Sequence, residues 1–130
     1  MHTDILQYET DHATYKALVR TFANSDLIEF EVQMLGISGN VLNKNGAEVV
    51  ASWSVDGFNN NGTFYSDTNG LEMQRRDLNY RPTWDLVTTE TMSGNYYPIN
   101  QAVAIRDLDL LKQLTVMNDR SQGGSSLASG

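Results

Sequence analysis

The sequence predicts an all-β protein, an antiparallel β-sandwich with little helix. Apolar and polar residues alternate over several short segments, and turn-forming residues recur about every ten positions. Residues 108–111 could form a helical turn, but the segment is too short to stand as a helix. The 130 residues have the length of one domain of modest size, so we expect a single β-sandwich segment over residues 1–130.

The clearest strand is expected over residues 28–34, where apolar and polar side chains alternate strictly. Such alternation places one face of a strand on a core and the other in water. A weaker strand is expected over residues 15–22, with the polar tetrad 23–26 as the hairpin turn between the two. We expect residues 1–12 to be frayed and the Gly- and Asn-rich residues 36–46 to form a long loop.

A second group of strands is separated by turn signals and by one long irregular connection. Asn69-Gly70 predicts a tight turn because both residues tolerate positive φ. Residues 79–94 show no clear period, so we expect an irregular connection there. The strands expected around these features cover residues 48–55, 63–66, 71–76, 96–106 and 113–117.

The charge balance narrows the possible partners. Nine Lys and Arg against 16 Asp and Glu give a formal charge of -7. Because nucleic acids and anionic membranes attract a basic face, neither is expected as a partner. No apolar run approaches a membrane span, and the N-terminal residues lack the pattern of a signal peptide. With no Cys, the chain has no disulfide and no thiolate chemistry.

Few residues suggest chemistry. His2 and Asp4 have a metal-like spacing, but a catalytic zinc site needs three converging ligands, so we expect no metal site. Glu29 and Glu31 are expected to be solvated surface rather than a glycosidase pair. Asn61-Gly62-Thr63 is an N-glycosylation sequon in a polar turn, which matters only in the secretory pathway. The basic residues Arg75, Arg76 and Arg81 are expected to pair with carboxylates of the fold.

Aromatic residues are the other candidates for binding. Trp84 and the pair Tyr96-Tyr97 have faces that could stack on sugar rings, although in a β domain such rings more often belong to the core. Trp53 lies on the expected buried face of residues 48–55, so sugar contact is expected less there.

Several longer motifs follow one another in the second half of the chain. They are FYSDTNGL at residues 64–71, RR at 75–76, RPTWDL at 81–86, NYYPI at 95–99 and GGSSL at 123–127. Together they resemble the C-terminal β-sandwich region of the class II α-mannosidases, glycoside hydrolase family 38, over roughly residues 13–130. RPTWDL and Asp119-Arg120-Ser121 most resemble the lysosomal or vacuolar branch.

The resemblance implies a fragment of a larger enzyme, with part of a galactose-mutarotase-like supersandwich. Family members are zinc-dependent, retaining glycosidases whose catalytic acids and zinc ligands belong to an N-terminal α/β domain. No catalytic residue is therefore carried onto this chain, no cofactor is expected in it, and alone it is expected to be inactive. The implied role is to support the catalytic domain and wall its cleft against a mannose-containing glycan. The implied location of the parent protein is the lysosome, the vacuole or the outside of the cell.

The resemblance also suggests loop-side contacts with the sugar. The residues suggested for these contacts are Asp119, Arg120, Tyr96 and Tyr97. Together with Trp84 they are the expected carbohydrate-contact residues. The alternative function is a free-standing carbohydrate-binding or interaction module. In either case a sandwich that lacks strands exposes sheet edges, which favour a homo-oligomer or aggregation.

Overall fold

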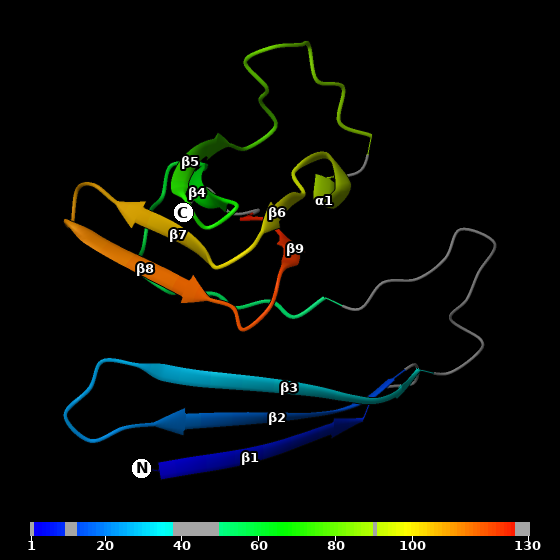
Figure 1. Ribbon diagram of the computed structural model, residues 1–130, viewed down its shortest axis with the longest axis vertical. Helices are drawn as coiled ribbons and strands as arrows, with labels where there is room; N and C mark the ends of the chain where they lie inside the picture. The colour runs from blue at the N-terminus through cyan, green and yellow to red at the C-terminus, as the bar shows by residue number, and fades with distance from the viewer. Residues whose placement is uncertain (1, 10–12, 38–49, 90, 127–130) are drawn as a thin grey trace. The chain divides into compact units, whose positions relative to one another are not determined.

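The computed structural model describes residues 2–9, 13–37, 50–89 and 91–126 and divides into two compact units, Met1–Trp53 and Ser54–Gly130. As predicted, it is all-β: its strands pair antiparallel, and the helix α1 (Thr91–Gly94) is a single turn (Figure 1). Within the described residues, no helix is both long and apolar enough to cross a membrane.

The first unit holds a three-stranded sheet in the order β1-β2-β3, blue to cyan in Figure 1. Two predicted strands are confirmed as β2 (Ala13–Thr21) and β3 (Ile28–Ile37), and Asn24 turns between them with φ 63°. The segment expected to be frayed instead contains β1 (His2–Glu9), which pairs with β2 along its whole length. Of the loop expected over residues 36–46, residues 36 and 37 instead belong to β3, and residues 38–46 lie outside the described residues.

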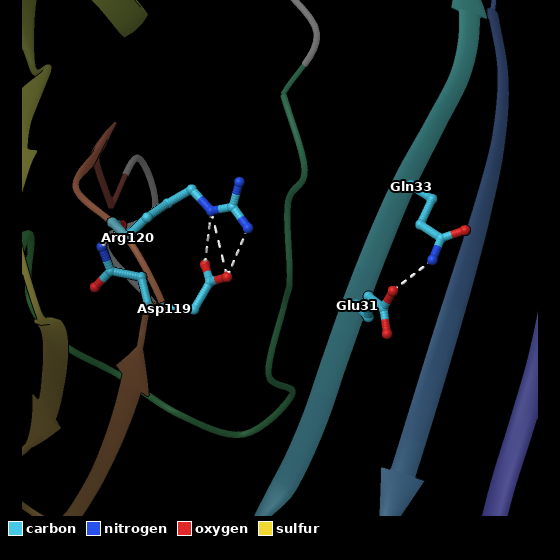
Figure 2. A network of polar contacts seen from close by, with 5 residues as sticks. Glu31, Gln33, Asp119 and Arg120 are labelled. Carbon is cyan, nitrogen blue, oxygen red and sulfur yellow. Dashed lines mark hydrogen bonds and ion pairs between the residues drawn. The ribbon is translucent and has the colours of Figure 1, made fainter.

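The strand β3 is confirmed, but its apolar face does not lie on a core as the alternation predicted: Phe30, Val32 and Met34 are 49%, 47% and 42% exposed. Glu29 and Glu31 form ion pairs with Arg20 of β2, so their face is solvated and charged. Glu31 also accepts a hydrogen bond from Gln33 (Figure 2). On the other face Phe30 packs against Trp53, with ring centroids 5.9 Å apart.

The strand expected over residues 48–55 is wrong for the described residues 50–55, which pair with no strand. Trp53 is accordingly 52% exposed rather than on a buried face. Alternation alone does not make a strand, because a strand needs a neighbour to complete its backbone hydrogen bonds.

The second unit holds a four-stranded sheet and a two-stranded sheet, green to red in Figure 1. The larger sheet has the order β5-β4-β7-β8, and the smaller sheet pairs β6 with β9. The strands are β4 (Thr63–Thr68), β5 (Glu72–Asp77), β6 (Tyr97–Ile99), β7 (Ala102–Asp107), β8 (Lys112–Met117) and β9 (Gln122–Gly124). The core of this unit contains Phe64, Ile99 and Ala104.

The single strand expected over residues 96–106 is instead divided into β6 and β7. Asp67 causes the division: its Oδ1 accepts the backbone N–H groups of Asn100 at 2.8 Å, Gln101 at 3.0 Å and Ala102 at 3.2 Å. A carboxylate that takes three successive N–H groups diverts them from a sheet ladder. The chain therefore changes sheets at Asn100 and Gln101.

The turns of the second unit form where turn-forming residues in the sequence predict them. Asn69 and Gly70 have φ values of 51° and 70° and connect β4 to β5, as predicted. Residues 79–89 are irregular, as expected for the long connection, and α1 closes it. Residues 108–111 form a turn rather than a helix, with Leu111 at φ 53°.

Candidate functional site

Two of the motifs meet in the small sheet. Tyr97, Pro98 and Ile99 of NYYPI pair with Gly124, Gly123 and Gln122 of the GGSSL region. A Cβ at Gly123 would overlap the ring of Tyr96, so glycine lets that ring lie directly on β9. This close approach fixes the Tyr96 side chain, which remains 42% exposed.

Asp119 and Arg120 lie in the connection from β8 to β9, and hydrogen bonds tie this connection to the end of β6. Asn118 donates from Nδ2 to the carbonyl of Ile99 at 2.9 Å, and Ser121 Oγ bonds Asn100 Oδ1 at 3.0 Å. These bonds attach the connection that carries Asp119 and Arg120 to the end of β6, the strand that begins at Tyr97.

The charged pair itself faces solvent. Arg120 contacts the Asp119 carboxylate at 2.8 Å, and the two side chains are 77% and 70% exposed (Figure 2). The hydrogen bond from Arg120 lowers the pKa of Asp119, and the same bond raises the pKa of Arg120. Both groups thus stay ionised at neutral pH and are accessible to the hydroxyl groups of a ligand.

Tyr97 is only partly accessible, because its ring is packed within the fold. Its centroid lies 5.6 Å from that of Phe64 in an edge-on arrangement, and the guanidinium carbons of Arg76 and Arg81 lie 4.5 Å and 4.3 Å from it. Among the described residues, Arg76 and Arg81 form no ion pair with a carboxylate and instead contact this aromatic ring. The expected carboxylate partner is confirmed for Arg75, which pairs with Asp77 at 3.0 Å.

Trp84 stands apart from the other candidates. It lies in the irregular connection and is 62% exposed. Among the described residues, no hydrogen bond or ring contact joins it to Tyr96, Asp119 or Arg120. Tyr96, Tyr97, Asp119 and Arg120 thus belong to segments that strand pairing and hydrogen bonds join, whereas Trp84 lies in the irregular connection.

Sequence reasoning missed two buried carboxylates that organise the second unit. Asp67 is 4% exposed, and backbone N–H groups, that of Gln101 foremost, lower its pKa to about 2. Asp107 is 2% exposed, and the N–H groups of Asn59 and Leu110 lower its pKa as well. The signal that could have found Asp67 is its place three residues before Gly70, where an Asp typically caps a turn.

Asn95 is another buried polar residue whose hydrogen bonds hold the second unit together, and the sequence analysis did not identify it. Its Oδ1 accepts the backbone N–H of Asn79 at 2.7 Å, and its Nδ2 donates to the Thr91 carbonyl at 2.9 Å. The first residue of NYYPI therefore closes the irregular connection. Much of the motif set consists of residues that hold the fold together.

The described residues do not fit a catalytic zinc ion. His2 Nε2 lies 3.1 Å from Asp4 Oδ1, and both side chains are exposed on β1. Two such groups fall short of the three ligands that a catalytic zinc requires. Within the described ranges, no group of three or more His, Cys, Asp or Glu side chains is arranged to hold a metal ion.

The second unit also has an open hollow of about 530 Å³. It lies beside the turn after β7 and includes none of the expected sugar-contact residues. Its lining consists of Val55, Asp56, Gly57, Phe58, Asn59, Asp107, Asp109 and Leu110.

The sequence of the chain is similar to those of several known proteins. The lysosomal α-mannosidase of Felis catus is 58% identical over 69 residues, which are 53% of this chain and 7% of that protein. That of Bos taurus is 49% identical over 85 residues, 65% of this chain and 8% of the relative. That of Cavia porcellus is 39% identical over 113 residues, 87% of this chain and 11% of the relative.

The chain thus spans only about a tenth of the length of the relatives it matches. The profile of the glycosyl hydrolases family 38 C-terminal domain matches residues 5–130, nearly the whole chain. The chain therefore belongs to glycoside hydrolase family 38, within its C-terminal domain.

Proposed function

We propose that the chain is a non-catalytic part of an α-mannosidase that supports the catalytic domain and walls its cleft. The observation that carries the proposal is the match of residues 5–130 to the family 38 C-terminal domain. Relatives named lysosomal α-mannosidases support the same assignment. We accordingly place the parent protein in the lysosome, with the catalytic domain and a mannose-containing glycan as the partners of this region.

For the parent protein we propose hydrolysis of α-mannosides with retention, carried out by two carboxyl groups of its catalytic domain. Zinc would belong to that domain as well. The buried carboxyl groups of this chain suit a different role. A glycosidase acid needs a raised pKa, whereas the pKa values of Asp67 and Asp107 are lowered by backbone N–H groups. These two carboxylates act as turn caps.

The wall itself is the surface that carries Tyr96, Asp119 and Arg120. Its rigidity follows from the pairing of β6 with β9 and from the hydrogen bonds of Asn118 and Ser121. A loop that is held in place loses little conformational entropy when a ligand binds. Exposed aromatic and charged groups on such a surface suit the C–H faces and hydroxyl groups of a sugar.

The test uses the full-length parent protein with Arg120→Ala. Loss of one hydrogen bond to a sugar at the cleft wall is expected to raise KM for a mannose oligosaccharide by about fivefold. A small aryl α-mannoside, which does not reach the wall, should keep its KM, and kcat should stay unchanged. The matched control is Arg75→Ala, which removes another exposed Arg–Asp pair, on β5.

An oligosaccharide KM that is the same for Arg120→Ala and Arg75→Ala would contradict the wall role. The inactivity of the isolated piece is tested separately. The 130-residue chain, supplied with zinc, is expected to release no aglycone from an aryl α-mannoside. Turnover that persists through purification of the chain would refute the non-catalytic assignment.

One observation favours a second function, a free-standing carbohydrate-binding module. Trp84 is 62% exposed and apart from the other candidates, as a sugar-stacking platform would be. Titration of the isolated chain with mannose oligosaccharides, followed by tryptophan fluorescence, discriminates the two functions. Saturable quenching that is lost in Trp84→Ala and kept in Trp53→Phe would favour the module.

A further inference from the structure

We infer that Asn61 is an N-glycosylation site, which carries an oligosaccharide when the chain passes through the secretory pathway. Asn61-Gly62-Thr63 is the only Asn-x-Ser/Thr tripeptide in the 130 residues. The inference rests on the proposed function, because a lysosomal enzyme reaches its compartment by that route. The geometry of the turn carries the rest of the argument.

Asn61 lies on an exposed turn, where its side chain is accessible to solvent. Asn61 and Gly62 form the turn before β4 with φ values of 50° and 69°, and the backbone N–H of Thr63 bonds the Asn60 carbonyl at 2.9 Å. Asn61 is exposed, and its own backbone N–H donates to Asn59 Oδ1 at 2.9 Å. Among the described residues, its side-chain amide makes no hydrogen bond that a glycan would have to break.

The modification replaces one bond of the donor by another. The Asn61 amide nitrogen attacks C1 of a lipid-pyrophosphate-linked oligosaccharide, the C1–N bond forms, and the C1–O bond to the pyrophosphate breaks. The lipid pyrophosphate leaves, and the amide proton passes to a base of the transferase. The folded turn then has only to accommodate the product, an uncharged branched sugar on an exposed side chain.

Folding sets the time at which the acceptor is accessible. In the folded chain, the hydroxyl of Thr63 donates to Asp77 Oδ1 at 2.9 Å, and Thr63 pairs with Asp77 across β4 and β5. The hydroxyl of the sequon is therefore engaged once the hairpin has formed. We place the transfer before β4 pairs with β5, while the chain is still being translocated.

The hairpin from β4 to β5 supplies an internal comparison. Asn69 and Gly70 have φ values of 51° and 70°, almost the same as those of Asn61 and Gly62, and Asn69 is exposed. The third residue is Leu71 instead of Thr, and it is 85% exposed. Leu71→Thr therefore builds a second sequon on a matching turn without removing a packed side chain.

The experiment expresses the chain behind a cleavable signal sequence in eukaryotic cells and measures the intact mass of the total cell-associated and secreted chain. Digestion with peptide N-glycosidase in heavy-oxygen water then labels each occupied asparagine as aspartate. We expect one glycan, at Asn61, in the wild-type chain and two in Leu71→Thr. We expect none in Asn61→Gly, which removes the acceptor and retains a residue suited to positive φ.

An unmodified Asn61 overturns the inference, whether or not Asn69 is modified in Leu71→Thr. Cleavage of the signal sequence, read from the same masses, shows that each variant reached the transferase. Because the signal sequence forces this route, the result does not depend on the α-mannosidase assignment. That assignment is tested by the KM comparison with Arg120→Ala, so the two proposals fail separately.

Discussion

The side chain of Phe64 allows the sharpest test of how the second unit is stabilised. Phe64 lies on β4, which pairs with both β5 and β7, and it is 0% exposed. Its ring packs edge-on against Tyr97 at 5.6 Å between centroids. Phe64→Ala removes this burial and leaves a cavity, so we expect the free energy of unfolding to fall by about 3–5 kcal/mol.

That loss is large against the stability of a whole domain, about 5–15 kcal/mol. Phe64→Leu keeps most of the apolar volume and is expected to cost less than about 1.5 kcal/mol. The difference between the two variants measures the cavity and the lost ring contact together. Leu71→Ala is the control, because a side chain that is 85% exposed should change the stability by less than about 0.5 kcal/mol.

Urea denaturation followed by far-ultraviolet circular dichroism measures these changes. With a slope of about 1–3 kcal/mol per molar urea, the Phe64→Ala midpoint should fall by at least about 1 M at an unchanged slope. If Phe64→Ala is already unfolded without urea, the urea midpoint of Phe64→Leu is still expected to lie below that of Leu71→Ala. A Phe64→Ala midpoint that coincides with that of Leu71→Ala would refute the assignment of Phe64 to the core.

Two further predictions concern the turns. The pKa of Asp67 is lowered to about 2 in the folded chain, against about 4 in the unfolded chain. The ionised carboxylate therefore contributes its full stabilisation above about pH 4, and this contribution is lost as the pH falls toward 2. Asp67→Asn should therefore be less stable than the wild type at pH 7, and their urea midpoints should converge over that acidic range; a constant difference would contradict the role of the charge. Leu111 is 89% exposed at φ 53°, so Leu111→Asn should relieve left-handed strain and raise the stability by up to about 1 kcal/mol. Thermal unfolding checks this, with Leu108→Asn, on an exposed residue of the same turn, as the control.

The sequence by itself determined the features that depend on neighbouring residues. The alternation over residues 28–34 predicted β3, and Asn69-Gly70 predicted the turn after β4, since period and positive φ are local properties. The order of the motifs predicted the family, which the match over residues 5–130 confirmed. The expected sugar contacts stay predictions, although the structure shows where each of these residues lies.

Only the tertiary structure decided which groups, far apart in the sequence, form hydrogen bonds or pack against each other. The Asp67 carboxylate takes the N–H groups that would have continued one strand through Asn100 and Gln101, and Gly123 gives the ring of Tyr96 its place on β9. Residues 50–55 alternate like a strand but belong to no sheet within the described residues, whereas β1 pairs with β2. A backbone group is satisfied by whichever partner the fold brings to it, and that partner can lie more than 30 residues away, as Asn100 and Gln101 do from Asp67.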